Sequence, residues 1–415
     1  MNILKDIQNT HSKAHILAGL KDADRQKLLL DLALELEKGT SEILKANLLD
    51  QENLPDSDPK KDRLKLNEAR VKDLVESLKQ VAGLQDPSGQ IFSDKTLENG
   101  LVIKKIAVPL GVVGIIYESR PNVTVDVSAL CLRSGNAVIL KGGKEAEHSN
   151  RILVEIIHRA LKNNNLPTEL VLLLPSDRSA VAELLKANRF VDVLIPRGSE
   201  ALIQFVRQNS LIPTIETGAG VVHTYVHGSA NLKMAIDIAV NAKTSRPSVC
   251  NALDCLLLDE SIAAQILPEL GAQMAKSKVK IHADETTYQI LKQSEYPYLF
   301  IANLDDFGKE WLDFEMSIKV VKGIDEALAH IAQYSSRHSE AIIAEDKNAC
   351  QRFLNEVDAA AVYTNASTRF TDGGEFGLGA EIGISTQKLH ARGPFALEKL
   401  VTEKWIVEGN GQIRV

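Results

Sequence analysis

From Gly111 onward, short apolar runs alternate with segments of helical character, and this pattern constrains the fold more than any other feature. The apolar runs cover 112–117, 137–141, 170–174, 191–195 and 214–216. The helix-like segments between them cover 123–132, 145–161, 179–187 and 199–208. Strands that are apolar on both faces and joined by helices are typical of a parallel sheet covered on both sides. The pattern therefore predicts an α/β domain that binds ligands at the carboxyl ends of its strands.

Other structural patterns flank this alternation. Residues 1–82 have helical periodicity, and a second α/β segment after Gly220 has strand-like runs near 253–258, 279–281, 318–321 and 360–363. Polar and apolar residues alternate within 91–108 around a turn at Asn99-Gly100, which predicts a hairpin. Such a hairpin is either a simple sheet edge or an arm that pairs with another subunit. The last residues, 400–415, return to a β pattern and are expected to add a strand to it.

Composition excludes several classes of function. The chain has 415 residues and a net charge of −7, and its basic residues are dispersed, which argues against a nucleic-acid surface. Neither an apolar leader nor an apolar run of membrane-spanning length occurs, so we expect a cytoplasmic protein without membrane contact. The four cysteines show neither a CxxC pair nor Cys/His ligand spacing, so no metal site and reduced thiols are predicted.

Cys250 is the candidate nucleophile. It lies between a helix-like run at 232–243 and a strand-like run at 252–258, with Arg246 close by in sequence. A neighbouring cation favours the thiolate form, which is the reactive form of cysteine. The alternative is a small buried side chain that fills core space. Cys131, Cys255 and Cys350 fit the interiors of helices or strands and are expected to be inert.

Two segments at strand ends are candidate phosphate sites. Gly198 and Ser199 lead directly into a helix, whose N-terminus attracts anions, although a Gly-Ser pair also serves as an ordinary helix cap. Lys141 and Lys144 flank two glycines between a strand and a helix. The usual dinucleotide fingerprint and the P-loop are both absent from the sequence.

These stretches resemble the gamma-glutamyl phosphate reductases of the aldehyde dehydrogenase superfamily. The resemblance covers nearly the whole chain in order, through 108–122, 195–199, 246–251, 321–342, 365–374 and 393–395. It implies an α/β, aldehyde-dehydrogenase-like fold with two Rossmann-like domains and a β oligomerisation arm. The implied parts are an NADP(H)-binding domain at 1–90 and 109–225, a catalytic domain at 226–395, and an arm at 91–108 and 396–415.

The resemblance also implies a reaction. It is the NADPH-dependent reduction of L-glutamyl 5-phosphate to L-glutamate 5-semialdehyde and phosphate, the second step of proline biosynthesis. Cys250 would form an acyl-enzyme thioester, and Asn122 with the Cys250 amide would stabilise the oxyanion. Implied partners are a second copy of the chain, in a homodimer or homotetramer, and transiently glutamate 5-kinase.

Cofactor residues are implied in the same way. Gly198 and Ser199 resemble the loop that holds the cofactor phosphates, and Lys141 resembles the lysine that contacts the adenine ribose. Lys144 adds a second cation where relatives that prefer NAD often carry an acid. Such a cation favours the 2′-phosphate of NADP(H).

Several roles stay open. Arg120, Arg246 and Arg369 are candidates for binding the substrate phosphate and carboxylate, or else form structural ion pairs. Glu216 lies where hydrolytic aldehyde dehydrogenases keep a general base, but a reductase gains nothing from hydrolysing its thioester, so a structural role is expected. A hydrolytic aldehyde dehydrogenase and a catalytically silent scaffold for the kinase are the alternative functions. His330 and His338 are assigned no chemistry.

Overall fold

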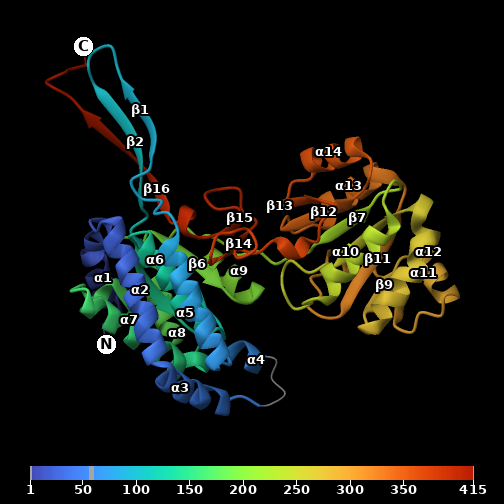
Figure 1. Cartoon of the computed structure of the whole chain (residues 1–415), viewed down its shortest axis with the longest axis horizontal. Helices are drawn as coiled ribbons and strands as arrows, with labels where there is room; N and C mark the ends of the chain where they lie inside the picture. The colour runs from blue at the N-terminus through green and yellow to red at the C-terminus, as the bar shows by residue number, and fades with distance from the viewer. Residues whose placement is uncertain (1, 56–59, 415) are drawn as a thin grey trace. The chain divides into compact units, whose positions relative to one another are not determined.

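The computed structural model describes residues 2–55 and 60–414, which divide into two compact units (Figure 1). The first unit comprises Met1–Thr217, Gly377–Gly383 and Pro394–Val415, and the second comprises Gly218–Phe376 and Ile384–Gly393. Each unit contains its own parallel sheet. The predicted α/β class is therefore confirmed, and both units follow the alternation of strands and helices expected from the sequence.

The sheet of the first unit has four parallel strands in the order β5-β4-β3-β6. Their bounds are β3 Val112–Tyr117, β4 Ala137–Lys141, β5 Val171–Leu173 and β6 Val193–Arg197. These strands lie within a few residues of the predicted runs. The predicted strand at 214–216 is wrong: Thr214 forms only an isolated bridge with Leu194. After this bridge, the chain stays in contact with β6 through a side chain, because the Thr217 hydroxyl donates to the Pro196 carbonyl at 3.0 Å.

Helices pack around this sheet in two groups. The helices α6 (Pro121–Arg133) and α7 (Glu147–Asn163) contact each other and the strands, and α2 (Asp22–Lys38) contacts both of them. The helices α1 (Ile3–Ala18) and α8 (Arg178–Leu185) contact each other, and α1 also contacts β3, β4 and β5. The other helices of this unit are α3 Thr40–Glu52, α4 Lys60–Leu64, α5 Glu68–Gly83 and α9 Glu200–Asn209.

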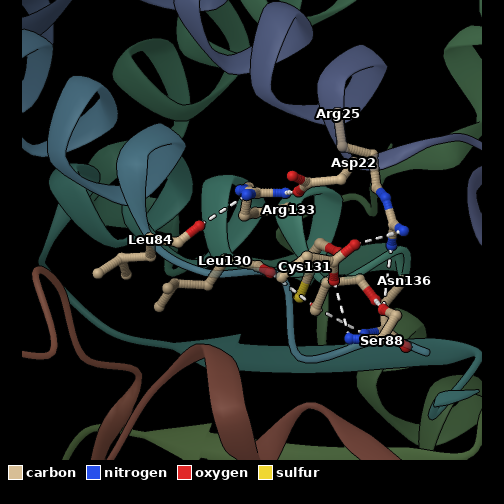
Figure 2. Close-up of polar contacts among 10 residues, drawn as sticks. Asp22, Arg25, Leu84, Ser88, Leu130, Cys131, Arg133 and Asn136 are labelled. Carbon is tan, nitrogen blue, oxygen red and sulfur yellow. Dashed lines mark hydrogen bonds and ion pairs between the residues drawn. The ribbon is translucent and has the colours of Figure 1, made fainter. Parts of the chain in front are cut away.

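A buried polar network joins the N-terminal helices to this core, as Figure 2 shows. The Arg133 guanidinium, at the end of α6, forms an ion pair with Asp22 of α2 and donates to the Leu84 carbonyl at 2.6 Å. Arg25 donates to the Ser88 hydroxyl at 3.1 Å. Arg25 also forms a buried ion pair with Asp86 at 2.6 Å, and removing one partner from such a pair costs about 3–5 kcal/mol. The Arg133–Asp22 pair contributes less, because the Asp22 side chain is 60% exposed.

The arm is a three-stranded antiparallel sheet with β2 in the middle (Figure 1). Its strands are β1 Ile91–Thr96, β2 Val102–Pro109 and β16 Val401–Glu408. Both the predicted hairpin and the predicted C-terminal addition are confirmed. Below the arm, the Asn136 side chain donates to the Leu400 carbonyl at 2.8 Å and accepts from the Gly111 amide at 2.8 Å, which ties the arm to β3.

The second unit contains a seven-stranded parallel sheet in the order β10-β9-β11-β8-β7-β12-β13. The strand bounds are β7 His223–Val226, β8 Cys255–Asp259, β9 Lys280–Ala283, β10 Leu299–Ile301, β11 Glu315–Val321, β12 Ser339–Ile343 and β13 Ala361–Thr364. Its helices are α10 Leu232–Thr244, α11 Glu260–Lys276, α12 Glu285–Gln293, α13 Gly323–Tyr334 and α14 Lys347–Glu356. Two further short strands, β14 Gly383–Ser385 and β15 Gly393–Phe395, pair with each other, and each includes residues of both units.

Alternate residues of β8 contribute to two separate cores of the second unit. Leu256 and Leu258 pack in a cluster with residues of α10, α11 and α12. Cys255 and Leu257 point to the other face and pack with residues of α13 and α14. This two-residue alternation is the geometry of a strand buried on both faces, which explains why β8 is apolar throughout. None of the helices described here has the length and apolar character needed to span a bilayer.

Candidate active site

Cys250 lies in the loop between α10 and β8, and its side chain is half-buried. The next residue, Asn251, anchors this loop: its side-chain amide donates to the Thr371 carbonyl at 2.9 Å. In return, the Asn251 carbonyl accepts a hydrogen bond from the Thr368 hydroxyl at 2.8 Å. The backbone around the thiol is therefore held by the segment that follows β13, so the position of Cys250 is fixed while its sulfur keeps some exposure.

Gly220 supports the same loop by a close backbone approach. A Cβ atom at this position would lie 1.6 Å from the Cys250 carbonyl oxygen and 2.9 Å from its Cα. No side chain fits at such distances, so only glycine allows this packing. The Gly220 amide also donates to a carboxylate oxygen of Glu310 at 2.8 Å.

Two arginines of the second unit, Arg369 and Arg246, act electrostatically near Cys250. Arg369 donates from Nε to the Ser245 hydroxyl at 3.2 Å, and its Nη1 forms a short hydrogen bond with the Asn251 side-chain oxygen. Burial and the neighbouring Arg246 lower the pKa of Arg369, whereas the Cys250 thiolate is among the groups that raise it. These couplings place two predicted arginines and the thiol in one electrostatic cluster. Such a cluster attracts anionic substrates and favours the thiolate.

In the first unit, Lys141 and Lys144 flank the end of β4. Lys141 is buried, and its ammonium donates to the Ser176 carbonyl at 2.9 Å. Burial lowers the pKa of Lys141, and nearby carboxylates counteract this effect. Lys144 is exposed. A cavity of about 510 Å³ opens beside this segment, and its lining includes Gly142, Ser176 and residues of α7 and β5. That volume is within the range of small-molecule and cofactor pockets.

The predicted phosphate loop already holds a carboxylate. Ser199 caps α9 by accepting from the Leu202 amide at 3.4 Å. Its own backbone amide donates to Glu118 Oε2 at 2.8 Å, and its hydroxyl lies 3.4 Å from Glu118 Oε1. A Cβ atom at Gly198 would lie 2.5 Å from the same carboxylate. The N-terminus of α9 thus receives an anion from the chain itself, which the sequence did not reveal.

Asn122 and Arg120 lie at the start of α6, where β3 ends. The Asn122 amide donates one hydrogen bond to Asp126 Oδ2 at 3.1 Å, one helical turn away. Burial raises the pKa of Asp126 to about 6, and the Asn122 hydrogen bond and Arg197 limit the rise. Just before, Ser119 has a left-handed backbone with φ 46°, held by hydrogen bonds from its amide and hydroxyl to Glu145. Strained residues of this kind often mark functional segments.

Comparison with known proteins identifies this arrangement. The aldehyde dehydrogenase family model matches residues 2–291. This chain belongs to the aldehyde dehydrogenase family. It is 50% identical to the gamma-glutamyl phosphate reductase of Chlorobaculum parvum, over 99% of this chain and 98% of that one. It is 52% identical to the one from Legionella pneumophila (strain Paris), over 94% of each chain.

Among solved structures, the gamma-glutamyl phosphate reductase of Thermotoga maritima matches over all of both chains, with a TM-score of 0.95 and 42% sequence identity. The resemblance inferred from the sequence and the predicted aldehyde-dehydrogenase-like fold are therefore confirmed. The domain boundaries and residue roles taken from that resemblance stay predictions.

Glu216 was expected from the sequence to have a structural role and not to act as a general base. Its carboxylate lies 3.5 Å from Arg207 Nε, and the Glu216 side chain is 18% exposed. Arg207 belongs to α9, so this ion pair joins two segments of the first unit. The contact is consistent with the structural role expected from the sequence.

Proposed function

We propose that this protein reduces L-glutamyl 5-phosphate to L-glutamate 5-semialdehyde, releases phosphate, and thereby performs the second step of proline biosynthesis. The supporting observation is full-length identity of about 50% to proteins named gamma-glutamyl phosphate reductase. Membership of the aldehyde dehydrogenase family implies a nicotinamide cofactor. The cavity beside Lys141 and the second cation at Lys144 support NADP(H) as that cofactor.

The first chemical step is an acyl transfer to the thiol. The Cys250 thiolate attacks the γ-carbonyl carbon, forming a C–S bond, and the C–O bond to phosphate breaks as phosphate leaves. Asn122 and the Cys250 amide stabilise the oxyanion, and each such donor lowers the barrier by about 3–4 kcal/mol. Asp126 accepts only one of the two amide protons of Asn122, which leaves the other for the oxyanion. Arg369 and Arg246 attract the anionic substrate to the thiol.

The second step converts the thioester to the aldehyde. NADPH, when bound, supplies the hydride that reduces the thioester carbon. The C–S bond then breaks, which regenerates the Cys250 thiolate and releases the semialdehyde. Water has to stay away from the thioester throughout, because hydrolysis would waste the intermediate. The ion pair between Glu216 and Arg207 supports a structural role for that carboxylate in place of a general base.

The reaction can be tested in reverse. Purified protein is mixed with glutamate semialdehyde and NADP⁺, and NADPH formation is followed with and without inorganic phosphate. We expect turnover that requires phosphate, is lost in Cys250→Ala and persists in Cys350→Ala, because Cys350 lies on α14 outside the loop. Turnover that does not depend on phosphate would favour a hydrolytic dehydrogenase. Absence of turnover with cofactor still bound would favour a silent scaffold for the kinase.

The arm supports a homo-oligomer. Its strands expose large apolar side chains at Ile91, Phe92, Trp405 and Val407. An exposed apolar sheet edge is a favourable surface for pairing with another chain. We therefore propose a homodimer or homotetramer built through the arm, together with a transient contact with glutamate 5-kinase that protects the labile acyl phosphate.

A further inference from the structure

Three side chains that commonly bind metals meet in the core of the second unit, outside the loop that carries Cys250. They are His223 on β7, Cys255 on β8 and His330 on α13. One donor atom from each lies within 4.8 Å of the other two. The Cys255 Sγ and His330 Nε2 atoms are 3.7 Å apart. Ligand atoms around a zinc ion are separated by about the same distance, given Zn–S and Zn–N bonds of about 2.3 and 2.0–2.1 Å.

The sheet register creates this cluster. His223 and Cys255 are directly paired on adjacent parallel strands, so their side chains point to the same face of the sheet. The core on that face includes residues of α13, and α13 carries His330. The edges of the aromatic rings also meet, with centroids of His223 and His330 5.5 Å apart. The cluster thus joins two strands and a helix at one point.

The surroundings of His223 are closed to solvent. Its side chain and that of Cys255 are almost completely buried, at 0% and 1% exposure. His223 Nδ1 lies 3.2 Å from the buried Glu340 carboxylate, and among the described residues Nε2 has no hydrogen-bond partner of good geometry. Buried polar atoms in proteins are nearly always satisfied, and a metal ion held with the neighbouring thiol and second imidazole would satisfy His223 Nε2. Such burial excludes a substrate of any size, which leaves an ion.

Glu340 provides the outer support that metal-binding histidines usually have. One carboxylate oxygen, Oε2, lies 3.2 Å from His223 Nδ1 and accepts the His223 backbone amide at 2.9 Å. The other oxygen, Oε1, accepts from the Ser335 hydroxyl. A carboxylate on Nδ1 orients the ring and leaves Nε2 to bind the ion. One divalent ion with the Cys255 thiolate and the Glu340 carboxylate would be electrically neutral, which suits a buried site.

We propose that His223, Cys255 and His330 bind one thiophilic metal ion, Zn²⁺ or Cu⁺, that crosslinks β7, β8 and α13. Two imidazoles and a thiolate select these ions over Mg²⁺ and Ca²⁺, which prefer oxygen ligands. Three protein ligands complete a trigonal Cu⁺ site, whereas Zn²⁺ takes a fourth ligand. Because the site is closed, the ion enters as the unit folds, and its binding stabilises the folded catalytic unit.

The test measures metal content of the full-length protein. Protein produced in medium supplemented with zinc or with copper is purified, and its metal is measured by mass spectrometry. We expect about one ion per chain from one of the two media. Cys255→Ser should lower this content roughly tenfold or more, whereas Cys350→Ser, which removes a half-buried cysteine of α14, should leave it unchanged. The medium that yields metal-containing protein identifies the bound ion.

Two readouts on the wild-type protein keep the test decisive if Cys255→Ser does not fold. Cobalt substituted at the site should give the near-ultraviolet charge-transfer band of a thiolate ligand, and chelation should lower the melting temperature. Wild-type protein without metal from either medium, and without a cobalt band, would overturn the proposal. Full metal content in folded Cys255→Ser would overturn it as well, because the thiol would then have no part in binding.

Discussion

Replacing Gly220 with alanine tests how strictly the active-site loop is positioned. The new Cβ atom would lie 1.6 Å from the Cys250 carbonyl oxygen, and real Cβ contacts are not found below 3.0 Å. The two backbones must therefore separate by at least about 1.4 Å. The nearest atoms are backbone atoms of Cys250, which cannot rotate away as a side chain could. Cys250, the proposed nucleophile, is then displaced together with its loop.

The displacement determines the expected effect. A misplacement of about 1 Å at a catalytic group costs about 100-fold in rate, so we expect kcat/KM of Gly220→Ala to fall by about that factor. Overpacking of this kind costs about 1–3 kcal/mol of folding free energy, which leaves most of the protein folded. The assays are NADPH formation from the semialdehyde, alkylation of Cys250, and thermal unfolding.

The matched control is Gly83→Ala at the end of α5. No atom lies within 4 Å of a Cβ placed there, so this variant should keep both activity and stability. A folded Gly220→Ala variant with wild-type kcat/KM would refute the argument, because the loop would then tolerate a shift that the geometry says must displace the thiol.

Three further predictions concern charges in the two units. Arg369→Gln should lower kcat/KM about tenfold or more, because the loop loses both a cation beside the thiol and a partner of Asn251. Steady-state kinetics should show this loss while the melting temperature stays unchanged. An unaltered kcat/KM would contradict the prediction. Because burial raises the pKa of Asp126 to about 6, the carboxylate that holds Asn122 is lost as the pH falls through that value, so kcat should decline below about pH 6. Asp126→Asn should remove this acidic limb, and a limb that persists in the variant would assign it to another group. Lys144→Glu should weaken NADPH binding about tenfold and leave NADH binding almost unchanged. Equal losses of affinity for both cofactors in binding titrations would show that Lys144 does not bind the 2′-phosphate.

Local patterns were sufficient to predict most of the architecture. The apolar runs that became β3 and β4 match their predicted bounds, because a strand buried on both faces is apolar throughout. The alternation of polar and apolar residues in the arm likewise predicted its hairpin correctly. Two central strands of the second unit, β7 and β12, were missed, since they are only four and five residues long and begin with His223 and Ser339.

Contacts between residues that are far apart in the sequence could not be predicted from it. Cys255 was expected to be inert and no metal site was predicted, because His223, Cys255 and His330 show no ligand spacing in the sequence. Their meeting depends on the strand order β12-β7-β8 and on α13 packing over that face. Likewise, nothing near Ser199 in sequence indicated that Glu118, from the end of β3, would reach its amide.

The central claim is that Cys250 carries a thioester that phosphate, and not water, resolves. The most direct measurement is mass spectrometry of protein mixed with glutamate semialdehyde and NADP⁺ in the absence of phosphate. A glutamyl adduct should appear on the peptide that contains Cys250 and disappear when phosphate is added. No adduct on that peptide, or an adduct that decays equally fast without phosphate, would contradict the mechanism.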